Sequence, residues 1–379
     1  MKNKNEDEIL IKFLRYCFHN ESEEALRTAL KNVDWNQFVK TIYQHEIQGF
    51  VFQQLSEKKL PVEVPTEIIK QLQTLTRQVA IQNMAHQAQG DKVVTGLQEK
   101  GIPFIILKGL PLMEMISHHN WLRPSSDIDI LVHQSDMGII NQVLKWTGFV
   151  WYIPEHFENN KEEFLKIQNK CGEIHYFKKT EDFFYNVDIH WRLSGLSEES
   201  PLKKIFPIDD YPWFSNPIPG RFGKNEIQCL NHEMQFIHLV FHFVLHHHFR
   251  RLKTFIDICL YCQNFGETLN WKLIHQIVRE PSCQKSIVIT LLLIKKLTGQ
   301  DYSQLYRSDL LPRFSILPGE YRWYSRQLLI QENTVVRYLL TTIILPSKIK
   351  EKLIMLHYYF LRYTHKLCLK VRKRWRILR

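Results

Sequence analysis

Several strings that identify common enzyme classes are missing from this sequence. It has no Gly-x-x-x-x-Gly-Lys-Ser/Thr loop, no Gly-x-Ser-x-Gly turn and no His-Glu-x-x-His pair. These absences argue against P-loop NTPases, α/β-hydrolases and zinc peptidases of that type. No apolar run approaches the roughly 20 residues that a membrane-spanning helix needs. The seven cysteines follow no regular spacing, so we expect reduced thiols in a cytoplasmic protein.

Acidic residues are absent from the last part of the chain. The last acid is Glu351, and nine Lys and Arg residues follow it. Removing these nine from 50 leaves 41 basic against 39 acidic residues, a net charge of +2 for residues 1–351. A near-neutral body disfavours long nucleic acid as a partner. Residues 352–379 alternate apolar and basic side chains, which is typical of a helix that touches an anionic membrane or RNA, or of a packed helix with a solvated basic face.

The hydrophobic pattern divides the chain into four regions. Residues 1–97 have helical periodicity. Residues 98–196 mix short apolar runs with helical periods, which predicts a small core domain of α/β (α+β) class with a mixed sheet. Residues 197–230 contain five prolines and no sustained period, so we expect a linker or excursion. Residues 231–379 are predicted to form a C-terminal helical domain with a basic tail.

More detailed expectations follow from the same periodicity. We expect one long helix over residues 67–97 and, in the α/β region, further helices over 110–119, 135–146 (capped by Ser135) and 158–170. Strands are expected over 102–107, 127–132 and 148–152, with an antiparallel pair over 173–178 and 183–191.

Two acids in one of these strands define the candidate site. Asp127 and Asp129 lie two residues apart, so a strand places both carboxylates on one face and turns Ile128 and Ile130 to the other. Carboxylates on one face repel each other unless a cation lies between them. Hard oxygen ligands at this spacing suit Mg²⁺, which keeps some waters and binds phosphates. The pattern predicts a metal site for phosphoryl or nucleotidyl transfer; solvated acids on a strand edge are the alternative.

A third acid and a cation could complete this site. Asp188 lies between β-branched residues in a second predicted strand, with His190 on the same face. A buried acid needs a partner, and a metal shared with the first two acids would supply one, although Asp188 could equally be structural. Lys108 and Gly109 end an apolar run at a helix start, where an ammonium and backbone N–H groups can bind phosphate. Arg123 is a further phosphate candidate.

Three motifs in this order resemble the uncharacterised bacterial nucleotidyltransferase family of the DNA polymerase beta-like superfamily. They are Leu107-Lys108-Gly109, residues 122–132 and residues 187–193. The resemblance implies a nucleotidyltransferase core in which Asp127 and Asp129 hold the metals and Asp188 is the third acid, which also orients the attacking hydroxyl. Lys108-Gly109 takes the place of the Gly-Ser pair that precedes the double acid in the wider superfamily. The nucleotide- and phosphate-binding candidates here are Lys108, Gly109, Arg123 and Ser126.

The helical stretch after the proline-rich region is rich in histidine. His238, His242 and His246 recur at i, i+4 and i+8 and form one stripe. The resemblance implies that a His-bearing helix followed by basic residues closes over the active site, so His242, Arg251 and Lys253 are candidates for binding nucleotide or acceptor. A zinc site and purely structural histidines remain open as alternatives.

Taken together, these patterns predict an enzyme that moves a nucleoside monophosphate from an NTP to a small-molecule or peptide acceptor. The metal would be Mg²⁺, or Mn²⁺ in its place, in a two-metal mechanism. Members of the family that this chain resembles tend to occur beside surface-polysaccharide or peptide natural-product genes, so the resemblance implies a small or peptidic acceptor rather than DNA. One alternative is a transferase on the same scaffold that attaches another group to a phosphorylated peptide. Another is a non-catalytic module that docks to a membrane or RNA through residues 352–379.

Overall fold

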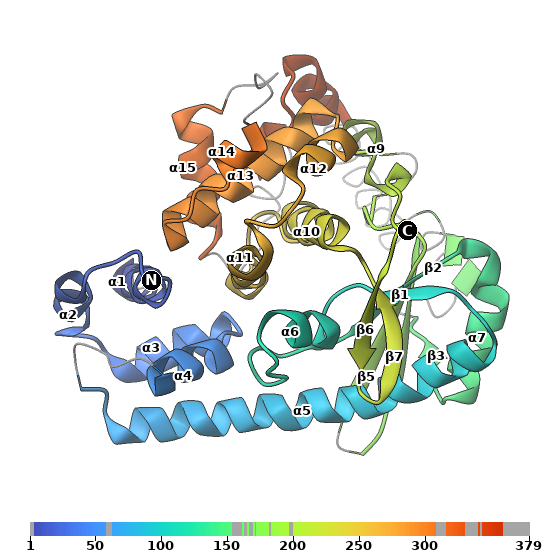
Figure 1. The fold of residues 1–379 in the computed structure, drawn as a ribbon, viewed down its shortest axis with the longest axis horizontal. Coiled ribbons are helices and arrows are strands. Elements are labelled where there is room, and N and C mark those ends of the chain that lie inside the picture. The colour runs from blue at the N-terminus through green and yellow to red at the C-terminus, as the bar shows by residue number, and fades with distance from the viewer. Residues whose placement is uncertain are drawn as a thin grey trace, which may run out of the picture.

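The computed structural model describes most of the chain and confirms a mixed α/β architecture. The described residues are 4–57, 63–153, 161–162, 165–166, 170, 172–181, 183–196, 200–307, 316–329, 340–341 and 343–358. Most of the helix expected over 158–170 lies outside them. The described residues contain a five-stranded mixed sheet, a two-stranded sheet and many helices. Figure 1 shows the N-terminal helices at one end of the molecule and the sheet at the other.

The five-stranded sheet has the order β1-β2-β5-β4-β3. Its central pair, β2 and β5, is parallel, and the other neighbours are antiparallel. The predicted antiparallel pair is confirmed as β4 and β5. The strand bounds are β1 Phe104–Ile106, β2 Ile128–Val132, β3 Val150–Trp151, β4 Glu173–Lys179 and β5 Phe184–His190.

The N-terminal region is helical, as its periodicity predicts. Ser22 and Asp34 begin two of these helices by accepting backbone N–H groups with their side chains. The long helix α5 runs along the molecule from the N-terminal helices to the sheet, which confirms the single helix expected there (Figure 1). The bounds are α1 Lys4–Cys17, α2 Glu23–Leu30, α3 Trp35–Gln44, α4 Gln48–Glu57 and α5 Thr66–Glu99.

Two helices connect the strands of the sheet. Helix α6, Leu110–Ile116, follows β1, and α7, Met137–Trp146, follows β2. The expectation that Ser135 caps α7 is wrong. Ser135 lies within the 3-10 turn η1, Gln134–Asp136, and its hydroxyl donates to Asp136 Oδ1 at 3.4 Å. Helix α7 therefore begins after Asp136.

The proline-rich region contains a hairpin that the sequence pattern did not predict. Its strands β6, Ile218–Phe222, and β7, Asn225–Cys229, pair antiparallel around the turn at Gly223. The short elements α9, Pro201–Ile205, and η3, Ile208–Asp210, precede this hairpin.

The histidine-rich stretch begins the C-terminal helices. Helix α10, His232–Phe241, continues into a π-helical segment η4, His242–His246. The following helices are α11 Leu252–Phe265, α12 Trp271–Ile277, α13 Pro281–Thr298, α14 Ser303–Arg307 and α15 Pro318–Gln327. Residues 349–358 are helical as well. None of the helices in the described part of the chain combines the length and the apolar character needed to cross a bilayer.

Two hydrophobic cores lie on opposite faces of the sheet. Ile128, Ile130 and Val132 belong to the core shared with α5 and α7, as the alternation in β2 predicts. Leu131 belongs to the larger core of the helical regions. Every residue of β2 is buried, including Asp129 at 4% exposure. The acidic face of the strand is therefore covered by the rest of the molecule, and its charges need partners.

Candidate active site

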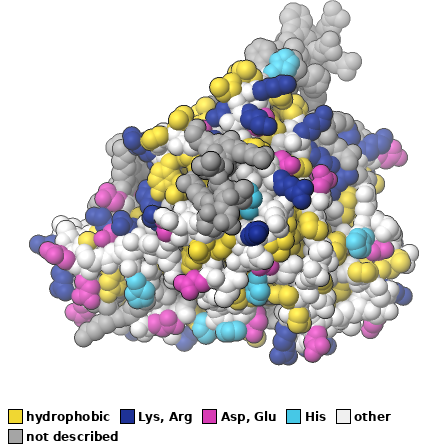
Figure 2. Space-filling model, turned by 45° about the horizontal axis from the view of Figure 1, so that its top comes forward, with side chains coloured by type: hydrophobic (Ala, Val, Ile, Leu, Met, Phe, Trp, Pro, Cys, Tyr) yellow, Lys and Arg dark blue, Asp and Glu magenta, His cyan; other side chains and the backbone are white. Residues whose placement is uncertain are grey.

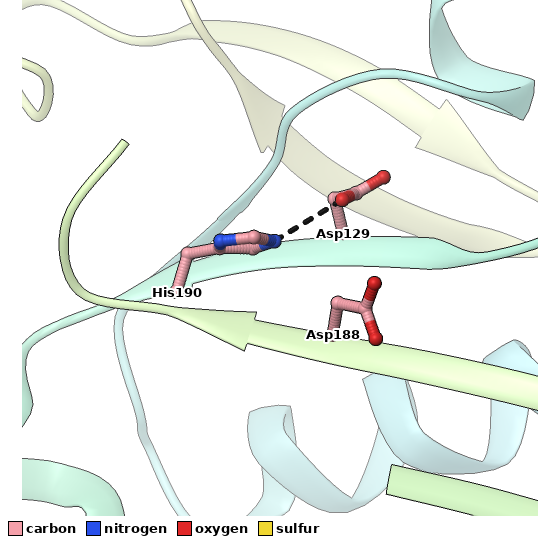
Figure 3. Close-up of side chains that lie close together, drawn as sticks. All are labelled: Asp129, Asp188 and His190. Carbon is pink, nitrogen blue, oxygen red and sulfur yellow. Dashed lines mark hydrogen bonds and ion pairs between the residues drawn. The ribbon is translucent and has the colours of Figure 1, made fainter. Parts of the chain in front are cut away.

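Asp129 and Asp188 face each other across the two central strands. They are register partners in the parallel pair β2 and β5. Their side chains lie on the same side of the sheet as His190, and ligand atoms of all three residues lie within 4.8 Å of one another (Figure 3). Alternation explains this grouping, because i and i+2 on β5 share a face and the register places Asp129 beside Asp188. His190 Nε2 lies 3.1 Å from Asp129 Oδ1.

Asp127 joins this group through Lys108. It directly precedes β2, and its side chain is one-third exposed. Lys108 Nζ lies 3.1 Å from Asp129 Oδ2 and 3.8 Å from Asp127 Oδ2, so both carboxylates face one ammonium. This shared contact confirms that the two acids lie on one side of the chain. Burial raises the pKa of Asp129, but the charges of Lys108 and His190 outweigh burial and keep it well below its usual value.

Gly109 allows the chain to turn directly after Lys108. Its φ is +73°, which a residue with a side chain rarely adopts, and it is the N-cap residue of α6. A Cβ at this position would lie 2.9 Å from Ser125 Oγ. The glycine therefore brings the β1–α6 turn against the loop that precedes the acids, and this approach directs Lys108 toward them.

The loop before the acids is held by Asn83 on α5. Asn83 Oδ1 accepts the backbone N–H of Ser125 at 2.9 Å, and its Nδ2 donates to Arg123 O at 2.9 Å. Asn83 is fully buried. Ser126 is exposed beside Asp127, and Asn186 Nδ2 donates to its carbonyl at 3.2 Å. The sequence pattern did not single out Asn83, because a polar residue within a long amphipathic helix usually faces solvent.

The histidine stripe is confirmed and contacts the acids through Lys108. The rings of His238 and His242 are 5.9 Å apart, and those of His242 and His246 are 4.9 Å apart. His242 begins the π-helical segment, and its Nε2 lies 3.4 Å from Lys108 Nζ. Burial and the nearby ammonium hold the pKa of His242 well below its usual value. The neutral ring can therefore accept a hydrogen bond from Lys108.

A carboxylate and a histidine on β4 extend the group. His175 Nδ1 lies 2.8 Å from Asp188 Oδ1, and its Nε2 lies 3.7 Å from Glu173. Glu173 Oε2 in turn lies 3.4 Å from His190 Nδ1. The side chains thus form a continuous chain of alternating carboxylates and imidazoles from Asp188 to Asp129. Glu173 and His175 were missed by the sequence analysis, since alternating polar residues in a strand usually face solvent.

These contacts set the protonation states of the carboxylates and imidazoles in this row. Hydrogen bonds to Asp188 and Glu173 raise the pKa of His175 to about 10. Burial raises the pKa of Glu173, but contacts with His175 and His190 outweigh it and lower that pKa to about 2. Burial and repulsion from Asp129 raise the pKa of Asp188, and the contact with His175 offsets them in part. His175 is therefore an imidazolium at neutral pH that balances one of the carboxylates.

Comparison with known families agrees with this geometry. The family described as uncharacterised nucleotidyltransferase matches residues 31–299, which is more than half of the chain. The chain belongs to this nucleotidyltransferase family. No curated protein and no solved structure gives a match. The matched range contains the five-stranded sheet, the histidine stripe and the acids described above.

The other predicted cations form a neighbouring cluster. Arg123 Nε lies 3.0 Å from Asp257 Oδ2 on α11, and both side chains are nearly buried. Lys253 Nζ lies 3.0 Å from Glu46 and 3.5 Å from Pro124 O. Arg251 lies 3.2 Å from the same glutamate and is more than half exposed. The structure thus brings Lys108 and His242 to the acids and places these three cations in ion pairs around the preceding loop.

The group at the sheet is suited to a divalent cation. Asp129 Oδ2 is buried and accepts no well-aligned hydrogen bond from any described residue, although Lys108 Nζ is near. Two carboxylates and one imidazole within 4.8 Å provide oxygen and nitrogen ligands for Mg²⁺ or Mn²⁺. His190 was noted in the sequence as a residue on the face of Asp188, and the structure adds it to the candidate ligands.

Proposed function

We propose that this member of the family transfers a nucleoside monophosphate from an NTP to an acceptor, with Mg²⁺ or Mn²⁺ at the central acids. The observation that carries the proposal is the close grouping of Asp129, Asp188 and His190 on adjacent parallel strands. Membership of a nucleotidyltransferase family supports nucleotidyl transfer as the reaction class. The proposal includes that the fold belongs to the DNA polymerase beta-like superfamily.

In this proposal the acids hold the metal and the basic side chains bind the nucleotide. Asp127, Asp129 and Asp188 are the metal ligands. A bound divalent cation would neutralise charge on the transferred phosphate and lower the pKa of the acceptor hydroxyl. Lys108 provides a positive charge beside the same carboxylates, where it can contact a phosphate oxygen. His242 Nε2 lies 3.4 Å from that ammonium and can accept a hydrogen bond from it.

The acceptor in this proposal is a small molecule or a peptide. The near-neutral charge of residues 1–351 supports this choice, because proteins that bind long nucleic acids usually carry positive charge over the folded body. Arg123, Arg251 and Lys253 lie around the loop that precedes the acids. We assign these three cations, with Gly109 and Ser126, to binding of nucleotide or acceptor.

A thermal-shift experiment tests the reaction class. ATP, GTP, CTP and UTP are each added with and without Mg²⁺ to wild type and to Asp129→Asn. We expect a nucleotide to raise the melting temperature only with the metal, and we expect Asp129→Asn to abolish that shift. Asp210→Asn is the control, because Asp210 is an exposed acid at a distance in sequence from the site. A shift that survives in Asp129→Asn, or no shift with any nucleotide, would contradict the proposal.

A further inference from the structure

The helix at residues 349–358 carries a row of exposed aliphatic side chains. Ile349 is 77% exposed, Leu353 60% and Leu356 53%. These positions are i, i+4 and i+7, so they form one stripe along the helix. Ile354 is 41% exposed beside them. Aliphatic residues grouped in this way are unusual on the surface of a soluble domain and indicate a contact with something else.

The opposite side of this helix is fixed to the body. Met355 is fully buried in the large helical core. Lys352 Nζ lies 2.9 Å from Glu320 on α15, and Glu351 Oε2 accepts the hydroxyl of Ser282 on α13 at 2.8 Å. The aliphatic stripe is therefore held in place by contacts on the other face, and its exposure does not arise from a loose helix end.

Basic residues lie beside the stripe and follow it in the sequence. Lys350 is exposed on the same helix, and the chain after Glu351 contains nine Lys and Arg residues and no acid. Figure 2 shows hydrophobic and basic side chains next to one another at the top of the molecule. An apolar stripe flanked by Lys and Arg is the pattern of helices that lie in the interface of an anionic bilayer.

We propose that the stripe of Ile349, Leu353 and Leu356 docks this protein on an anionic lipid surface. The aliphatic side chains enter the headgroup region, and the exposed Lys350 contacts the lipid phosphates, while the net positive charge of the residues after Glu351 attracts the protein to an anionic surface. RNA fits less well, since Ile and Leu offer no ring on which a base can stack. A second copy fits less well because two such basic segments would repel each other. The proposal is independent of the reaction that the acids perform.

Vesicle flotation with the full chain tests this docking surface. Wild type is mixed with vesicles of phosphatidylcholine alone or of phosphatidylcholine with phosphatidylglycerol. We expect binding to the second kind only, and weaker binding at high salt. The triple variant Ile349→Ser, Leu353→Ser, Leu356→Ser should bind at least about tenfold more weakly, because each buried CH₂ contributes about 0.8 kcal/mol. Replacing the basic residues between 370 and 376 by Gln should also weaken binding.

A matched control separates docking through the stripe from non-specific adsorption of exposed apolar side chains to vesicles. Ile81 and Met84 on α5 are 58% and 60% exposed, so Ile81→Ser, Met84→Ser removes comparable apolar surface elsewhere. This variant should float like wild type, and both sets should keep the wild-type melting temperature because the altered side chains face solvent. Equal flotation of the triple variant and wild type would overturn the proposal. So would a wild-type dimer in light scattering that the triple variant loses, or RNA binding that depends on the stripe.

Discussion

Replacing Lys108 by methionine tests how strongly its positive charge stabilises the carboxylates of the site when no metal is bound. The ammonium lies 3.1 Å from Asp129 Oδ2, 3.8 Å from Asp127 Oδ2 and 3.4 Å from His242 Nε2. The ammonium therefore has two carboxylates and a neutral imidazole around it. Methionine keeps most of the side-chain volume and removes the charge. The substitution therefore leaves the two carboxylates to repel each other in a covered site.

The contacts suggest the size of the effect. At an effective dielectric constant of about 20, the attraction across 3.1 Å between Lys108 and Asp129 is about 5 kcal/mol. The contact with Asp127 counts for less, because that carboxylate is one-third exposed and screened by water. Removing one partner of a buried pair costs about 3–5 kcal/mol. Asp129 keeps its contact with His190, so we expect a loss near the lower end, about 3 kcal/mol.

Urea unfolding followed by fluorescence, in EDTA and in Mn²⁺, measures this loss. We expect Mn²⁺ to stabilise Lys108→Met more than wild type, because the cation replaces the missing charge. Lys295→Met is the control: Lys295 Nζ lies 2.6 Å from Asp301, but the lysine is half exposed, so its loss should cost at most about 1 kcal/mol. The reasoning is refuted if Lys108→Met costs no more than Lys295→Met, or if Mn²⁺ stabilises both proteins equally.

Three further results are expected. His175 has a pKa of about 10, so the stabilisation from its charge is fully present below about pH 6.5 and is lost as the pH rises through 10. The difference in unfolding free energy between wild type and His175→Gln should therefore shrink from about pH 6.5 to about pH 10. Arg123→Met and Asp257→Leu should each cost about 3–5 kcal/mol, and a double-mutant cycle should show less than additive loss; additivity would contradict the pair. Gly109→Ala places a Cβ 2.9 Å from Ser125 Oγ at positive φ, so thermal unfolding should show a loss of about 1–3 kcal/mol; an unchanged melting temperature would argue against strain there.

The grouping at the sheet was only partly predictable. The strands around Asp129 and Asp188 follow from their apolar alternation, and so does the shared face of Asp188 and His190. The parallel pairing that makes Asp129 and Asp188 register partners joins residues 59 positions apart. Local periodicity contains no information on register between distant strands. Glu173 and His175 were missed although the pairing of β4 with β5 was predicted, because alternating polar residues in a strand usually face solvent.

The arrangement of the histidine stripe was also predictable only in part. Spacing alone places His238, His242 and His246 on one side of a helix, and the ring contacts confirm it. The change to a π-helix at His242 and its contact with Lys108 depend on packing between the helix and the sheet. Burial there makes the rings neutral, and a neutral ring can accept a hydrogen bond from an ammonium. An isolated helix in water would leave the same histidines near their usual pKa.

By itself, the sequence determined most of the strands and helices around the acids and which face of each carries charge, because those properties depend on neighbours a few residues apart. It did not predict the hairpin of β6 and β7. Tertiary structure decided which charges meet. It placed Lys108 between Asp127 and Asp129, joined Asp188 to His175, and paired Arg123 with an acid of a distant helix. The physical reason is that burial in a covered face makes a partner obligatory for each charge, while long-range packing alone selects that partner.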